Sequence, residues 1–485
     1  MIEIINLLKN AKVTPQILET RLKDPIRNVE YPQRDAYNLL RNYIEDFFKN
    51  GDEPRMLGLA GLRGVGKTTL MWQLAKYTYE NVSTNIYQFN VNALSSNGIT
   101  LLEVLEVLQE QILKQRFNTY TEPIIFLFDE VHDDENWKKT IKIVYDECKT
   151  AFVIATGSSA LLINQTADLA SRMKVEKIYP FKFTEFVNAK ATLDIHLLDT
   201  PKNIASELKQ TLFFSEDYNH LKESFNVLKF ELSIKKYLSE VAILFNKDVF
   251  EVLKEYVSYH NIPRYSSYKK VEDIHQIIIE LVKRIIYEDV TKINSKYSGF
   301  QFEKLLHRLA SSDEINFDKL SQTLGLKKED IENALNTLDS AELLNLIHVN
   351  SNNIDALLTR NKKAFFMSPS IRLALLSSIY GNNVPDSAKS KIWEDIVMMY
   401  LSKIIGKAMI SFSAEKTGVN PDFIIQTRDC PIVFEVGTKK TTTKQLSQYK
   451  QKIRYGVLLN AKATEIEFND KNQTLILPLS WFLML

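Results

Sequence analysis

The sequence predicts an α/β multidomain protein, and three observations lead to this fold class. The chain has 485 residues, which is too long for one ordinary core because domains usually hold about 100–200 residues. Residues 56–160 alternate short apolar runs with amphipathic stretches, a pattern typical of a parallel sheet covered by helices. From about residue 186 to residue 300 apolar residues recur at helical spacing, and strand-like runs return near the C-terminus.

Composition narrows the functional classes. Charged residues make up 25% of the chain but cancel to a formal net charge of +1, so no global field draws it to nucleic acid or anionic lipid. Cys148 and Cys430 lack the paired spacing of a disulfide framework or a cysteine metal site. The sequence shows no signal-like N-terminus and no run of about 18 apolar residues. We therefore expect a cytoplasmic protein without a membrane partner.

A glycine-rich motif follows the first apolar run, MLGLA. Residues 61–68 read GLRGVGKT and match the pattern G-x-x-x-x-G-K-[ST] directly before a helix-forming stretch. Glycines let backbone N–H groups turn toward phosphates, and the N-terminus of the following helix adds a positive dipole end. Lys67 should reach the β- and γ-phosphates, and Thr68 should bind Mg²⁺. The motif therefore predicts ATP and Mg as cofactors.

The apolar run IIFLFDE ends in two carboxylates, Asp129 and Glu130. This position is the carboxyl end of a strand, where ligands of parallel sheets bind. Asp129 is expected to hold Mg²⁺ or its water, and Glu130 is suited to orient and deprotonate the attacking water. The strand candidate NIYQFNV lies between the two motifs in sequence, as in the ATPase class that uses a catalytic glutamate. The expected nucleotide-binding residues are Gly61, Leu62, Arg63, Gly64, Val65, Gly66, Lys67, Thr68, Thr69 and Asp129.

A third strand is expected in AFVIATGSS, and its polar end is the next candidate. A side chain at Thr156 or Ser158 is placed to sense the γ-phosphate, although a turn that caps the next helix explains the same residues equally well. Arg172 follows in DLASRMKVEK. A lone arginine is most often a solvated or salt-bridged side chain, so the residues by themselves leave both roles open.

The run VIATGSSALLI…DLASRMKVEKIYPFKFTEFV resembles the stretch after the acidic motif in the archaeal-type AAA ATPases, a STAND-like branch of P-loop NTPases. This resemblance implies that Ser158 is a sensor and that Arg172 is a phosphate-sensing or finger arginine. Both would then act with Lys67 and Glu130 in catalysis. The family usually has glycine before that arginine, whereas this chain has Ser171, which puts the local backbone geometry in doubt.

The resemblance extends to segments outside the nucleotide motifs. NIPRYSSYKK and VKRIIYEDV look like lid segments of that family. Arg34 and Asp35 match a position near the adenine, although the start of a surface helix accounts for them equally well.

Residues 317–347 predict a helix, a turn at Gly325, a second helix and a short strand, which is a winged-helix pattern. Lys327 and Lys328 would open the second helix, where side chains that read DNA often lie. Three acidic residues follow among the next four positions, and acidic groups oppose contact with phosphates. A packing or protein-contact role is therefore favoured over DNA contact.

The final segment carries an acidic helix, Trp393-Glu394-Asp395, and two carboxylates at strand ends, Asp422 and Glu435. Such groups can converge on one divalent metal. This order resembles the PD-(D/E)XK nuclease fold, also called restriction-endonuclease-like, which the archaeal-type ATPases often carry.

One position departs from the nuclease pattern. The lysine expected two residues after Glu435 is Gly437, with Lys439 and Lys440 as candidate replacements. Gln445 and Tyr449 match a helix motif of some of those nucleases. The metal site at Asp422 and Glu435 is a prediction, and a catalytically inactive nuclease-like fold is favoured.

These features divide the chain into five expected segments. They are an N-terminal helical extension (1–25), a P-loop ATPase domain (26–185), a helical lid (186–305), a winged-helix domain (306–385) and a PD-(D/E)XK nuclease-like domain (386–485).

The leading functional hypothesis is a Mg-dependent ATPase that works as a switch or motor coupled to nucleic acid, in mobile-element or defence biology. The alternative is a signalling or chaperone-like ATPase that binds a protein partner through an inactive nuclease-like module. Either function is compatible with an oligomer.

Overall fold

The computed structural model describes most of the chain and divides it into two compact units, Met1–Tyr179 and Pro180–Leu485. The residues that it does not describe are 1, 158–168, 170, 194–202, 228–229, 269, 313–314, 352–361, 414–419, 439–445, 447–448 and 450–451.

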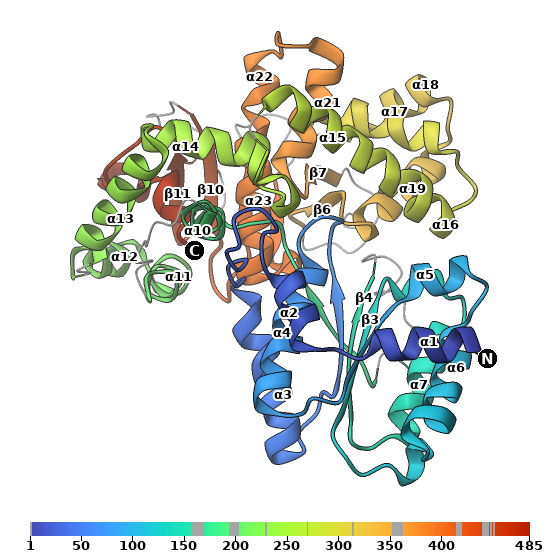
Figure 1. Ribbon diagram of the computed structural model, residues 1–485. Helices are drawn as coiled ribbons and strands as arrows, with labels where there is room; N and C mark the ends of the chain where they lie inside the picture. Colours follow the sequence, from blue (N-terminus) through green and yellow to red (C-terminus); the bar gives the residue numbers. More distant parts are fainter. Residues whose placement is uncertain are drawn as a thin grey trace. The chain divides into compact units, whose positions relative to one another are not determined.

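The first unit is built on a five-stranded parallel sheet (Figure 1). Its strands are β1 (Met56–Ala60), β2 (Ile86–Asn90), β3 (Ile124–Asp129), β4 (Ala151–Thr156) and β5 (Lys174–Lys177), in the order β2-β3-β4-β1-β5. β1, β3 and β4 are buried along their whole length, as expected for parallel strands covered on both faces. The parallel sheet with its covering helices confirms the predicted fold class for this part of the chain.

Helices cover both faces of this sheet, with α3 and α4 on one side and α6 and α7 on the other (Figure 1). The helical elements of the unit are α1 (Ile2–Ala11), α2 (Pro15–Leu22), α3 (Ala36–Asn50), α4 (Lys67–Asn81), α5 (Val91–Ser96), α6 (Leu101–Val107), η1 (Leu108–Leu113), η2 (Phe117–Thr119), η3 (Val131–Asp133) and α7 (Trp137–Glu147). Aromatic rings fill the α6–α7 side, where the parallel rings of Phe126 and Phe128 lie 5.8 Å apart and Phe89 stacks on Phe128.

Two features of this sheet were not expected from the sequence. β4, and not β2, lies between β1 and β3, so the strand that separates the two nucleotide motifs in space is the one that ends at Thr156. β5 is an additional strand that pairs with β1. Its sequence, KVEK, is polar and only partly buried, so it lacks the apolar run by which the other strands are recognised.

The second unit contains a helical part and an eight-stranded mixed sheet. Its helical elements are α10 (Phe183–Leu193), α11 (Ile204–Phe214), α12 (Tyr218–Val227), α13 (Phe230–Phe245), α14 (Val249–Glu255), η4 (Tyr256–His260), η5 (Pro263–Tyr265), α15 (Val271–Arg284), η6 (Ile285–Val290), α16 (Thr291–Ile293), α17 (Gly299–Ala310), α18 (Phe317–Leu324), α19 (Lys328–Ser340), α21 (Pro369–Tyr380), α22 (Asp386–Lys389), α23 (Lys391–Ile405), η7 (Lys407–Met409), η8 (Asp470–Asn472) and α25 (Leu479–Phe482).

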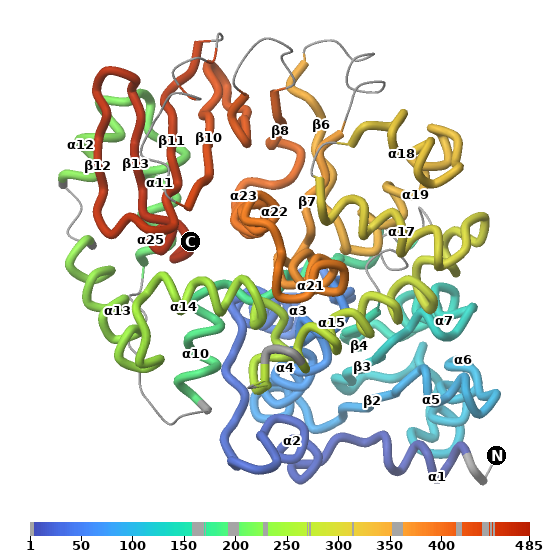
Figure 2. The backbone as a smooth tube through the Cα atoms, turned by 90° about the horizontal axis from the view of Figure 1, so that it is seen from above, coloured from blue at the N-terminus to red at the C-terminus, as the bar shows by residue number. Residues whose placement is uncertain are grey.

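The strands of this sheet run in the order β12-β13-β11-β10-β9-β8-β6-β7 (Figure 2). They are β6 (Leu344–Val349), β7 (Lys362–Phe366), β8 (Ile410–Phe412), β9 (Phe423–Ile425), β10 (Ile432–Gly437), β11 (Tyr455–Asn460), β12 (Glu467–Asn469) and β13 (Thr474–Pro478). β10, β11 and β13 are parallel neighbours. The mixed sheet agrees with the prediction of a second α/β region.

The segment with the winged-helix pattern joins this sheet directly. α18 ends at Gly325, whose φ of +67° is readily adopted by glycine, and α19 leads into the antiparallel hairpin β6–β7. β6 also pairs in parallel with β8, through His348 with Ser411 and Val349 with Phe412. Strand pairing therefore crosses the expected domain boundary at residue 385.

A fully buried ion pair joins helices of this unit to β7. Arg372 on α21 contacts both carboxylate oxygens of Asp395 on α23, at 2.6 and 2.9 Å, and both side chains are 0% exposed. The Phe366 N–H donates to the same carboxylate at 2.8 Å. Arg372 also donates to the carbonyls of Leu309 and Ala310 at the end of α17. Burial raises the pKa of Asp395, and the Arg372 guanidinium opposes this shift.

We predict that Arg372→Met destabilises the protein by about 3–5 kcal/mol, because it leaves a buried carboxylate without its cation. Urea unfolding followed by tryptophan fluorescence measures the change. Arg284→Met is the matched control, since its pair with Glu288 is largely exposed and such pairs contribute about 1 kcal/mol or less. Equal effects of the two substitutions would contradict the assignment.

Candidate functional site

The glycine-rich loop lies between β1 and α4 and begins where the backbone leaves no space for a side chain. Gly61 has a φ of +155°, and a Cβ there would lie 2.3 Å from the carbonyl oxygen of Ile178. Gly66 precedes α4 with a φ of +89°. Positive φ is accessible to glycine at little cost, so the motif glycines allow the chain to turn from β1 into the N-terminus of α4.

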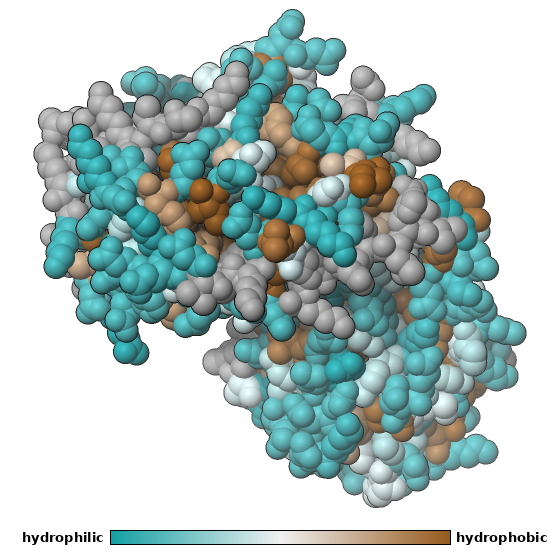
Figure 3. All heavy atoms as spheres, turned by 90° about the vertical axis from the view of Figure 1, so that its left-hand side faces the viewer, coloured by the Kyte–Doolittle hydropathy of each residue, from teal (hydrophilic) through white to brown (hydrophobic). Residues whose placement is uncertain are grey.

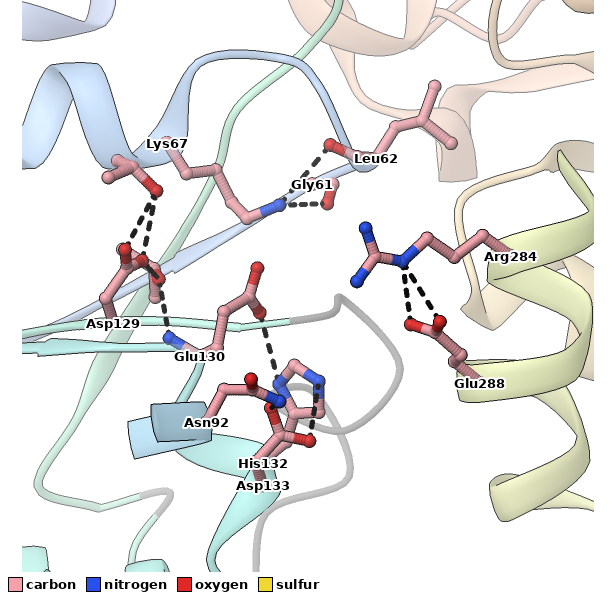
Figure 4. Close-up of polar contacts among 12 residues, drawn as sticks. Gly61, Leu62, Lys67, Asn92, Asp129, Glu130, His132, Asp133, Arg284 and Glu288 are labelled. Carbon is pink, nitrogen blue, oxygen red and sulfur yellow. Dashed lines mark hydrogen bonds and ion pairs between the residues drawn. The ribbon is translucent and has the colours of Figure 1, made fainter. Parts of the chain in front are cut away.

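Lys67 opens α4 and folds back over the loop (Figure 4). Its Nζ donates to the carbonyls of Gly61 at 2.8 Å and Leu62 at 3.3 Å, and the residue is buried. Arg34 braces the same loop by donating to the Val65 carbonyl at 2.5 Å and to the Tyr179 carbonyl at 2.9 Å. The ammonium is thus held within the loop whose backbone is expected to surround the phosphates.

The carboxylate of Asp129 accepts hydrogen bonds from two hydroxyl groups at the carboxyl edge of the sheet. Thr68 Oγ1 lies 3.0 and 3.2 Å from its two oxygens, and Thr156 Oγ1 donates to Asp129 Oδ1. Thr156 also accepts the backbone N–H of Glu130 at 3.1 Å. A hydroxyl beside a carboxylate fits the oxygen ligands that Mg²⁺ prefers, so Thr68 and Asp129 are suited to hold the ion.

Glu130 directly follows β3, and its carboxylate lies beside His132 (Figure 4). Its backbone is left-handed, with a φ of +57°, a conformation that is uncommon outside glycine and often marks functional sites. Its side chain is 34% exposed, and His132 Nδ1 lies 3.4 Å from Oε2. The His132 side chain is only 2% exposed, so it can orient the carboxylate while leaving it open to water.

Thr156 and His132 are site residues whose roles could not be assigned from the sequence. Thr156 was an open alternative beside Ser158, and its position one strand away from Asp129 follows only from the order β3-β4-β1. His132 had no motif of its own, although its place two residues after Glu130 was a signal. Ser158 lies outside the described residues.

Arg172 is not brought to the glycine-rich loop. It precedes β5, and therefore lies toward the amino edge of the parallel sheet, whereas the loop follows the carboxyl end of β1. Its Nε pairs with Asp146 Oδ1 at 3.2 Å, and its guanidinium lies 5.7 Å from the Tyr145 ring centroid. Arg172 is therefore salt-bridged to Asp146 of α7 and lies away from the glycine-rich loop of its own chain.

The second unit brings an unpredicted lysine to the carboxylates that follow the nuclease pattern. Lys363 on β7 is almost buried, and its Nζ lies 3.0 Å from Glu394 Oε2 and 3.8 Å from Asp422 Oδ1. Asp422 Oδ2 accepts the Val436 N–H at 2.9 Å. Burial, followed by the charges of Glu394 and Glu435, raises the pKa of Asp422 well above its usual value, and Lys363 opposes this shift.

This geometry changes the expected metal site at Asp422 and Glu435. An ammonium group, and not only carboxylates, occupies the centre, and the described part of the chain holds no group of three His, Cys, Asp or Glu side chains placed to bind a metal ion. The candidate lysines Lys439 and Lys440 lie outside the described residues, as does Gln445. The Tyr449 hydroxyl lies 3.4 Å from Asn350 Nδ2.

Comparison with known proteins supports the assignment of the first unit. Residues 53–187 match the family model described as AAA domain, so the chain contains an AAA-type P-loop ATPase domain. Residues 251–379 match a family described only as a domain of unknown function. No helix among the described segments is long and apolar enough to cross a bilayer.

Two curated relatives share sequence with this chain. An uncharacterized protein of Methanocaldococcus jannaschii is 28% identical over 99% of this chain and 93% of its own length. An uncharacterized protein of Haemophilus influenzae is 28% identical over 31% of this chain and 37% of its own length.

Solved structures are similar only at a low level. The Thermotoga maritima RuvB Holliday junction branch migration motor is 16% identical, with 65% of this chain and 89% of that chain covered and a TM-score of 0.27. The Aeropyrum pernix ORC1 protein in complex with DNA is 12% identical, with 76% and 98% covered and a TM-score of 0.30. TM-scores this low carry no information about the function of this chain.

We predict that Thr156→Val slows ATP hydrolysis by on the order of tenfold to a hundredfold while ATP affinity changes little. The substitution removes the hydroxyl that is hydrogen-bonded to both Asp129 and the Glu130 N–H. Steady-state turnover and calorimetry separate the two effects. Thr78→Val is the matched control, since Thr78 is equally buried but donates within α4 to the Leu74 carbonyl. Turnover equal to that of this control would rule out a positioning role for Thr156.

Proposed function

We propose that this protein is a Mg-dependent ATPase whose ATP hydrolysis drives a conformational switch or motor coupled to nucleic acid. One observation carries the ATPase part of the proposal. Lys67 and Thr68 at the start of α4 lie beside Asp129 and Glu130 at the end of β3, on a single edge of the parallel sheet. This is the edge at which open α/β sheets bind ligands.

Each residue has a defined task in this proposal. Lys67 leaves the carbonyls that it now contacts and binds the β- and γ-phosphates. Thr68 and Asp129 hold Mg²⁺, which supplies charge compensation for the phosphates when it is bound. Glu130 orients a water molecule and accepts its proton as the water attacks the γ-phosphate. The Thr156 hydroxyl holds Asp129 and the Glu130 backbone in position.

We predict that Glu130→Gln keeps ATP affinity but slows hydrolysis by on the order of a hundredfold or more, because the amide cannot accept the water's proton. Lys67→Ala should instead lose ATP binding, because the cation for the phosphates is removed. Calorimetry with ATP and Mg²⁺ and a phosphate-release assay test both variants. Normal turnover in Glu130→Gln would mean that another residue is the base, and unchanged affinity in Lys67→Ala would refute the nucleotide site.

The coupling to nucleic acid is tested by ATP turnover with and without single- and double-stranded DNA. Strong stimulation of the wild-type protein by either form supports a DNA-coupled ATPase. Turnover that is indifferent to both forms favours the signalling or chaperone-like alternative, in which the C-terminal part binds a protein.

The Lys363 contacts support a second proposal, that the C-terminal carboxylate centre does not cleave nucleic acid. In nucleases of the PD-(D/E)XK type, which this segment resembles, a metal ion and a lysine both stabilise the negative charge at the scissile phosphate. Here the ammonium of Lys363 lies against Glu394 and Asp422 and compensates their charge from within the protein. The fold would then act as a binding module.

We predict that Lys363→Met creates a divalent-cation site, because it leaves crowded, buried carboxylates without a cation. In the absence of nucleotide, Mn²⁺ should raise the melting temperature of Lys363→Met by several degrees and leave the wild-type value unchanged. Lys362→Met is the matched control, since Lys362 is equally buried on the same strand but pairs with Glu332.

The accompanying assay is Mn²⁺-dependent plasmid cleavage by the wild-type protein beside an Asp422→Ala, Glu435→Ala variant. We expect no difference between them. Robust wild-type cleavage that disappears in the double variant would establish a second catalytic centre and contradict the proposal.

A further inference from the structure

A hollow in the second unit opens beside the carboxyl ends of two parallel strands. It has a volume of about 630 Å³, and Thr438 and Lys462 line it. Thr438 follows β10, and Lys462 follows β11. The first residues of α23 also line it. Crevices at the carboxyl ends of parallel strands are the usual ligand sites of open α/β sheets.

The walls of this hollow are basic. Lys254, Lys389 and Lys462 line it, and Asp386 is its one acidic residue among those that the structure describes. Lys389 lies 3.9 Å from Asp386, whose side chain is fully exposed, so this pair is weak. The lysines therefore outweigh the single carboxylate, and the hollow favours an anionic ligand.

Two aromatic residues, Phe250 and Trp393, line the hollow. The rings of Phe250 and Trp393 stack with centroids 5.9 Å apart, and Lys462 Nζ lies 4.9 Å from the centroid of the Phe250 ring. This cation–π contact holds the ammonium beside the Phe250 ring. Positive charge beside aromatic rings suits a ligand with both phosphate groups and flat rings.

A second hollow of about 370 Å³ shares Phe250 and Lys462 with the first. Its other charged residues, Lys235 and Glu465, form an ion pair of 3.5 Å, so they add little net charge. Figure 3 shows hydrophobic side chains between hydrophilic ones on the face that carries α11 to α14. The two hollows adjoin at Phe250 and Lys462, and we call them together the groove; Lys254 and Lys389 line only the first of them.

We propose that this groove binds a single strand of nucleic acid, with its phosphates at Lys254, Lys389 and Lys462. The inference rests on the proposed coupling to nucleic acid and names the surface that makes it. Grooves that hold single strands combine a basic track with aromatic side chains. Two adjoining hollows of about 630 and 370 Å³ favour several linked nucleotides over one mononucleotide.

The test is the binding of a fluorescently labelled single-stranded DNA to the full chain, measured by anisotropy at several salt concentrations. Replacing the three groove lysines with Gln should lower affinity by roughly tenfold or more in low salt and make the salt dependence shallower by about two, since each phosphate contact on a single strand contributes about 0.7. ATP affinity and melting temperature should stay at their wild-type values.

A matched variant with Lys236, Lys283 and Lys304 replaced by Gln loses the same charge from the second unit outside the groove, and it should bind as the wild type does. Wild-type affinity in the groove variant, or displacement of the strand by a mononucleotide at equal phosphate concentration, would overturn the groove assignment. If DNA still stimulates ATP turnover in that case, the proposed function stands without this groove. If the wild type binds no DNA and its turnover ignores DNA, the proposed function fails as well.

Discussion

Parallel pairing of β1, β4 and β3 is the constraint on which the nucleotide site depends. Parallel strands end on the same edge of a sheet, so the loop after β1 and the carboxylates after β3 meet there although they are far apart in sequence. Thr156 ends the strand between them and bonds to both Asp129 and the Glu130 backbone. Without this register, the motif residues would have no common ligand to act on.

The fold class could be predicted because its elements carry local signals. Apolar runs marked the buried strands, and glycines marked the loop that turns into α4. The order of strands in space carries no such signal, so the place of β4 between β1 and β3 was not foreseen. β5 could not be predicted, because a polar edge strand has no apolar run.

The same distinction separates the site residues that were foreseen from those that were not. Lys67, Thr68, Asp129 and Glu130 stand in contiguous motifs, whereas Lys363 reaches the C-terminal carboxylates from a strand far earlier in the chain. The place of Arg172 away from the loop of its own chain likewise depends on the direction of β5, which no local pattern encodes. Long-range pairing, and not residue type, decided these cases.

The pairing of β6 with β8 makes one continuous sheet out of two segments that sequence patterns treat as separate modules. α19 packs on β6, so it is attached to the same hydrogen-bonded sheet as β8 to β13. The helices α18 and α19 and the carboxylate centre are therefore attached to one continuous sheet. Replacing either segment with an unrelated module would therefore break the pairing of β6 with β8.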